Sequence, residues 1–139
     1  MKVISYSDLE NAFMFVSMSS FYERYAYLNK ETGDFYYVSD LGDSDELPDD
    51  LEENDKYVSI PHKNDLNLGR NLAMDFVSAN LPEQFERVRG FFSKKGAYAR
   101  FKDLLEDKDQ LEAWYEFENK AIEKALQDWC RENDIQLKD

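Results

Sequence analysis

The fold is decided by residues 25–38, which read YAYLNKETGDFYYV. Aromatic and branched residues fill two short runs, Tyr25–Leu28 and Phe35–Val38, and such residues suit the pleated surface of β-strands. Gly33, in the turn between the two runs, can take the positive φ that closes a hairpin. The stretch therefore predicts an antiparallel β-hairpin. Its aromatic residues are either exposed for protein contacts or covered by helices, and both alternatives remain open.

A helix is predicted before the hairpin. Ser7 and Glu10 have the spacing of a capping box, which satisfies backbone N–H groups at a helix start. Apolar residues then recur on one face, and the helix should end near residue 19 or 20. The inward-facing residues of this predicted helix are Leu9, Ala12, Phe13 and Val16.

The rest of the chain predicts one more strand and then helices. Residues 57–60 (YVSI) form a branched and aromatic run that Pro61 closes. From Leu68 onward, apolar residues recur at helical spacing in four segments, the last reaching Glu132. Strands early and helices late predict an α+β fold. We expect an N-terminal helix, a three-stranded antiparallel meander and a C-terminal group of about four helices packed on the sheet, in a single domain over residues 1–139.

Composition limits the location and the partners. The chain of 139 residues has 17 Lys and Arg against 30 Asp and Glu, a net charge of −13. This charge argues against general adhesion to nucleic acids or anionic membranes. The single cysteine, Cys130, allows no intrachain disulfide and fits a reducing compartment. The N-terminal residues lack the uninterrupted apolar run of a signal peptide, so we expect a cytoplasmic protein without a membrane segment.

Negative charge is concentrated in residues 40–55, which contain nine acidic residues and no basic one. Gly42 and Pro48 predict an exposed loop there. Its start resembles a calcium-binding loop, but the required glycine and bidentate glutamate are misplaced, so no metal site is predicted. An alternative is that the loop imitates a phosphate backbone and occupies a basic groove on a partner. The candidate contacts are then Asp43, Asp45, Asp49 and Asp50.

Positive charge is concentrated in residues 87–102, where no acidic residue occurs. Four aromatic residues are interleaved, and cations beside aromatic platforms are typical of single-stranded nucleic acid binding. The structural alternative is that the aromatic residues are core and the cations pair with the acidic loop or with a neighbouring subunit. The candidate anion-binding or partner-binding residues are Arg87, Arg89, Lys94, Lys95, Arg100 and Lys102.

Three segments carry a family resemblance. They are residues 96–105 (GAYARFKDLL), 114–117 (WYEF) and 128–133 (DWCREN). Together they resemble an uncharacterised bacterial protein family, number one-five-eight of the UPF series, over roughly residues 25–133. The resemblance implies one intact domain and directs attention to Arg100 and Lys102. It implies no activity, substrate or cofactor.

Catalytic residues are not predicted. His62 is the only histidine, and no nucleophile motif or phosphate-binding glycine loop accompanies it. Catalysis would require His62 to meet two or more carboxylates in a deep cleft. We therefore expect a non-enzymatic interaction or regulatory protein, with a protein partner or self-association and no cofactor. The alternatives are nucleic-acid or anionic-ligand binding through residues 87–102, and acidic mimicry through residues 40–55.

Overall fold

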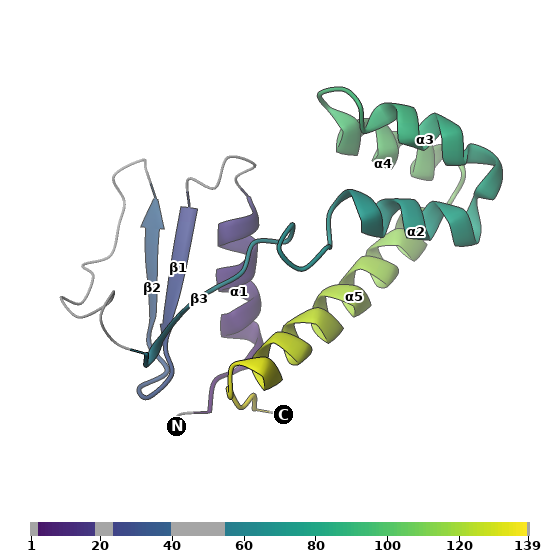
Figure 1. Cartoon of the computed structure of the whole chain (residues 1–139). Coiled ribbons are helices and arrows are strands. Elements are labelled where there is room, and N and C mark those ends of the chain that lie inside the picture. Colours follow the sequence, from purple (N-terminus) through teal and green to yellow (C-terminus); the bar gives the residue numbers. More distant parts are fainter. Residues whose placement is uncertain (1–2, 19–23, 40–54, 139) are drawn as a thin grey trace. The chain divides into compact units, whose positions relative to one another are not determined.

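The structure is a computed structural model that describes residues 3–18, 24–39 and 55–138 (Figure 1). The chain divides into two compact units. Unit 1 comprises residues 1–66 and 125–139, and unit 2 comprises residues 67–124. The last helix, α5 (Leu111–Glu132), belongs to unit 2 in its first part and to unit 1 in its last turns. A single domain over the whole chain stays a prediction.

The predicted N-terminal helix is α1, which spans Tyr6–Ser17. Its four predicted inward-facing residues are all buried. The predicted capping box is wrong, because the N-cap is Ser5, whose Oγ accepts a hydrogen bond from the Asp8 N–H at 3.1 Å. Ser7 lies exposed in the first turn instead. The helix ends at Ser17, slightly earlier than its spacing predicted.

The hairpin is confirmed. Strand β1 (Arg24–Asn29) pairs antiparallel with β2 (Phe35–Ser39). In the turn, the Asn29 Oδ1 accepts hydrogen bonds from the N–H groups of Glu31 and Thr32, at 2.9 and 3.3 Å. Gly33 has a φ of 81°, the left-handed conformation for which glycine has no steric cost.

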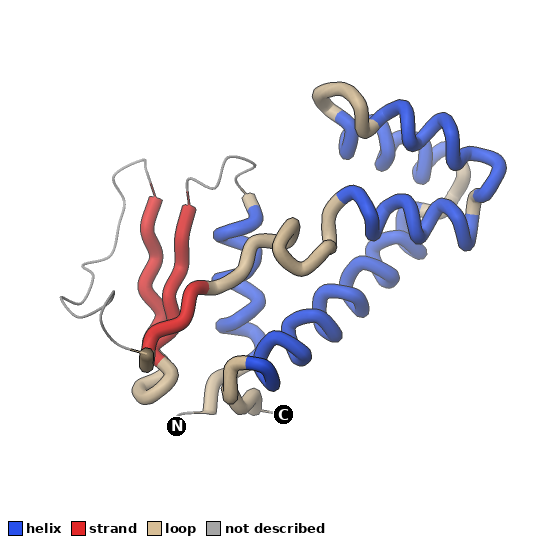
Figure 2. The backbone as a smooth tube through the Cα atoms, in the orientation of Figure 1, coloured by secondary structure: helices blue, strands red, loops and turns tan. Residues whose placement is uncertain are grey.

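The predicted third strand is β3 (Tyr57–Ser59), but the meander order is wrong. The strand order is β2-β1-β3, so β3 pairs antiparallel with β1 rather than with β2 (Figure 2). Burial accounts for the difference. Ala26 and Leu28 of β1 are fully buried, whereas every residue of β2 is only half-buried, so β1 takes the centre of the sheet.

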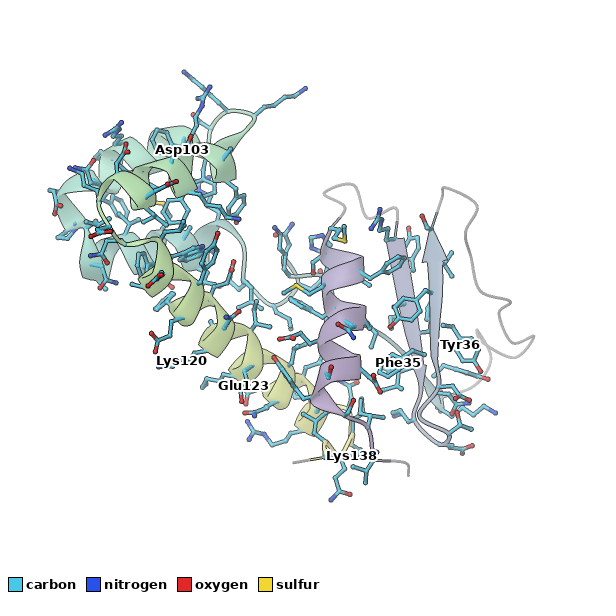
Figure 3. The ribbon with its side chains drawn as sticks, turned by 180° about the vertical axis from the view of Figure 1, so that it is seen from behind. Phe35, Tyr36, Asp103, Lys120, Glu123 and Lys138 are labelled. Atoms are coloured by element: carbon cyan, nitrogen blue, oxygen red, sulfur yellow. The ribbon has the colours of Figure 1, made fainter. Side chains whose placement is uncertain are left out.

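The two faces of the sheet differ. Helix α1 packs against β1, and the Phe15 ring meets the Tyr37 ring edge to face at 5.1 Å between centroids. Phe35 lies on this face and Tyr36 on the opposite one (Figure 3), as expected for neighbours in a strand. The register places four tyrosines on the opposite face, namely Tyr25, Tyr27, Tyr36 and Tyr57.

Unit 2 is helical, as the sequence predicted for this part of the chain. It contains α2 (Arg70–Asn80), a short 3-10 helix (Pro82–Gln84), α3 (Phe85–Phe91), α4 (Ala97–Asp107) and the first part of α5. Its core is aromatic. The Trp114 ring lies 5.5 Å from the Phe76 ring and 5.1 Å from the Phe101 ring, both edge to face. Packing of these helices on the sheet stays a prediction.

The two ends of the described chain meet in unit 1. The Ile4 N–H donates to the Gln136 carbonyl at 3.0 Å, and the Lys138 N–H donates to the Ile4 carbonyl at 2.8 Å. These bonds form a parallel bridge between Ile4 and Leu137. Within the described residues, every helix is too short or too polar to cross a membrane.

Candidate functional site

The six predicted cations lie on one helical hairpin of unit 2. We call this segment the basic hairpin and define it as α3, the turn at residues 92–96, and α4. The two helices pack against each other. Two of the cations lie on α3, two on the turn and two on α4, and all six are exposed: Arg87, Arg89, Lys94, Lys95, Arg100 and Lys102.

The turn is short and held by its own hydrogen bonds. The Ser93 hydroxyl donates to the Gly90 carbonyl at 2.7 Å, and the Lys94 N–H donates to the Phe91 carbonyl at 3.2 Å. Gly96 has a φ of 75° and directly precedes α4. Lys94 and Lys95 therefore stand at the tip of the hairpin.

The cations on each helix lie on opposite flanks. Arg100 and Lys102 are two residues apart, which is about 200° of rotation on a helix. Phe101, between them, is completely buried and marks the inward direction. The same relation holds for Arg87 and Arg89 on either side of the buried Val88. The predicted pair Arg100 and Lys102 therefore does not converge on one point. The two helices also carry four exposed acidic residues, namely Glu86, Asp103, Glu106 and Asp107.

Few of these cations are neutralised. Arg89 pairs with Glu86 at 3.6 Å, but the two side chains are 61% and 79% exposed, so this pair contributes little. Lys102 lies over the Tyr115 ring, with its Nζ 5.7 Å from the centroid. Within the described ranges, Lys94, Lys95 and Arg100 have no ion pair. The nearest acidic residue after the window, Asp103, is labelled in Figure 3.

The aromatic residues of the window belong mainly to the core. Phe101 is completely buried, and Phe92 packs against Tyr98 and Phe101 at 5.1 and 6.1 Å between centroids. Burial, with Glu118 as a second cause, raises the pKa of Tyr98 to about 12. The exposed aromatic residue beside the cations is instead Tyr115, which is 41% exposed. It lies outside the window, and only its contact with Lys102 reveals it.

Charge is divided unequally between the units. Unit 2 contains ten basic residues (Lys and Arg) and eleven acidic residues (Asp and Glu). Unit 1 contains seven basic and nineteen acidic residues. The basic hairpin thus belongs to a nearly neutral unit, and unit 1 holds almost all of the chain's net negative charge. The candidate acidic-loop contacts, Asp43, Asp45, Asp49 and Asp50, lie outside the described residues.

The single histidine, His62, and the single cysteine, Cys130, are both buried. His62 is 1% exposed, its Nδ1 accepts from the Asn64 N–H at 3.0 Å, and its own N–H donates to Asp65 Oδ2 at 3.0 Å. These bonds shape a turn. Burial raises the pKa of the Cys130 thiol to about 11, so the thiol is protonated at neutral pH. In the described ranges, no three His, Cys, Asp or Glu side chains are grouped so that they could hold a metal ion.

Comparison with protein families identifies a match to the chain. The model of an uncharacterised protein family, UPF0158, matches residues 3–138. This match extends over almost the whole chain and confirms the resemblance seen in three short segments. No curated protein and no solved structure matches the chain.

Proposed function

The chain belongs to the uncharacterised protein family UPF0158, and we propose that it is a non-enzymatic interaction protein of the cytoplasm. In this proposal the basic hairpin captures an acidic segment of a protein partner. The observation that carries the proposal is the exposure of six cations, in a window free of acidic residues, on a chain that is otherwise acidic. The cytoplasmic location rests on the single cysteine, which is buried as a thiol.

The aromatic residues favour a protein over a single-stranded nucleic acid. Base stacking needs an exposed ring face beside the cations. No aromatic side chain of the window is fully exposed. Phe101 is completely buried, Phe92 packs on Tyr98 and Phe101, and the Arg87 guanidinium lies over the half-buried Phe91 ring at 5.8 Å. The exposed aromatic residue beside these cations, Tyr115, lies outside the window, and tyrosine is enriched at protein interfaces.

The arrangement of the cations favours an extended acidic segment over a small anion. A small anion is held by donors that converge on one point. Here the paired cations of each helix are about 200° apart. An acidic segment that wraps the hairpin would meet the cations one after another, and complementary charge would speed its association.

Affinity capture from a cell extract tests the proposal. The bait is the full chain, at low and moderate salt, with and without nuclease treatment. The matched variants are Arg100→Glu with Lys102→Glu, and Arg70→Glu with Lys138→Glu. Each variant replaces one exposed Arg and one exposed Lys with Glu, so the two variants change the net charge of the chain by the same amount.

We expect the first variant to lose a protein partner that the second retains, with nearly unchanged circular-dichroism melts for both. Equal capture by both variants would refute the proposal. Capture that nuclease abolishes would assign the hairpin to nucleic acid instead. A melt that collapses only in the first variant would show that Arg100 and Lys102 are structural.

A further inference from the structure

We propose that unit 1 contains a binding pocket for a small organic monocarboxylate with an apolar body. The pocket has a volume of about 300 Å³ and lies where β3 leaves the sheet, at the first half of β1. This volume is at the lower end of the range found for ligand sites. The pocket is independent of the basic hairpin, because all its lining residues belong to unit 1.

The end of strand pairing creates the opening. The Ile60 N–H donates to the Ala26 carbonyl at 2.8 Å, but the next donor of this alternating ladder, the His62 N–H, donates to Asp65 Oδ2 instead. The chain therefore turns away from β1 while β1 continues to Arg24. The space between the first residues of β1 and residues 60–65 is the pocket.

Its walls are held by specific hydrogen bonds. The Lys63 N–H donates to the Ser17 Oγ at 3.0 Å, which ties the loop to the end of α1. Within the loop, the His62 N–H donates to Asp65 Oδ2, and the His62 Nδ1 accepts from Asn64. The opening is thus bounded by a fixed helix end, a strand and a braced turn.

The pocket is lined by apolar side chains and by one cationic side chain. Val16, Ala26 and Ile60 contribute apolar surface, with Tyr27 beside them. Arg24 is the cation. Its guanidinium lies over the Phe15 ring at 5.2 Å and donates to the Met18 sulfur at 3.4 Å.

Arg24 has no carboxylate partner among the described residues, although unit 1 is strongly acidic. It is half-buried, and its guanidinium contacts the Phe15 ring and the sulfur of the exposed Met18. A guanidinium without a carboxylate partner is suited to bidentate binding of a ligand carboxylate. Asp65 also lines the pocket, and its negative charge disfavours a ligand with a second anionic group. These features together select a single carboxylate on an apolar body.

A two-probe titration tests the pocket. The probes are phenylacetate and its neutral isostere phenylacetamide, titrated into the full ¹⁵N-labelled chain at millimolar concentrations. We expect phenylacetate to shift the amide signals of Ala26, Tyr27 and Ile60. We expect phenylacetamide to bind at least about tenfold more weakly, because it lacks the charge-assisted hydrogen bonds.

Two variants test whether phenylacetate binding depends on the charge of Arg24 or on the net charge of the chain. Arg24→Gln should weaken phenylacetate binding at least about tenfold. Lys108→Gln, which removes an exposed cation from unit 2, should leave it unchanged. Equal affinity for the two probes, or an absence of shifts at these amides, would overturn the proposal. This comparison uses the unmodified chain, so it decides the matter even where Arg24→Gln fails to fold.

Discussion

Truncation of Phe101 to alanine is predicted to remove a large part of the stability of unit 2. The side chain is completely buried, and its ring packs edge to face on Trp114 at 5.1 Å and tilted on Phe92 at 6.1 Å. Removing a buried phenylalanine ring loses its transfer free energy and leaves a cavity, which together cost about 3–5 kcal/mol. Total stabilities of domains are about 5–15 kcal/mol, so the loss is a large fraction.

The assay is thermal unfolding followed by far-ultraviolet circular dichroism. For a chain of this length, 1 kcal/mol corresponds to a change of about 3–5 °C in Tm. The predicted decrease in Tm is therefore about 9–25 °C. Tyr115→Ala is the matched control, because that ring is 41% exposed and its truncation should cost less than about 1 kcal/mol.

The opposite outcome would refute the assignment of Phe101 to the core. A Phe101→Ala variant within about 1 kcal/mol of the wild type cannot have lost a buried ring. If that variant also lost partner capture, Phe101 would be an exposed platform. The nucleic-acid alternative for residues 87–102 would then regain its basis.

Four further predictions concern single residues. Gly96→Ala should destabilise the chain by about 1–2 kcal/mol in urea unfolding, because its φ of 75° strains a Cβ even though nothing lies within 4 Å of it. Gly90→Ala, at the exposed penultimate residue of α3, should instead stabilise it by about 0.5–1 kcal/mol, and a loss of stability there would contradict the helical conformation of Gly90. Cys130 should resist iodoacetamide at pH 8 until the chain is unfolded, since its thiol has a pKa of about 11; rapid native labelling would contradict its burial. The folded pKa of Tyr98, about 12, exceeds its ordinary value of 10.0, so its contribution to stability is complete below pH 10 and is lost as the pH rises towards 12; Tyr98→Phe should reduce this loss in urea titrations.

The sequence predicted the local elements well because short-range patterns determine them. The hairpin follows from two aromatic runs and Gly33, and α1 follows from one-face spacing. The strand order could not be predicted in this way. The order depends on which strand pairs on both of its edges. Strand β1, with the buried residues Ala26 and Leu28, becomes the central strand only because β3, from residue 57 onward, pairs with its free edge.

The position of the first cap also depends on distant residues. Ser5 and Ser7 each precede an acidic residue by three positions, so the local pattern does not choose between them. The structure selects Ser5, and its neighbour Ile4 is fixed by the bridge to Leu137 at the other end of the chain. A local reading of the sequence does not include that contact.

The candidate site was predictable only in its charges. Lysine and arginine side chains are mostly exposed in folded proteins, so a cationic window predicts an exposed surface. Aromatic residues in the same window give no such indication, and here the helical period turns Phe101 inward. The contact between Lys102 and Tyr115 joins two helices and has no local signal.

The most direct test of the central claim is the salt dependence of partner association, measured for the captured protein partner with the wild-type chain and with Arg100→Glu, Lys102→Glu. Complementary surface charges raise association rates at low salt and lose this effect as salt screens them. We predict that the wild-type association rate falls steeply with salt, and that the rate of the variant is lower and nearly independent of salt. The same steep salt dependence in both chains would contradict it.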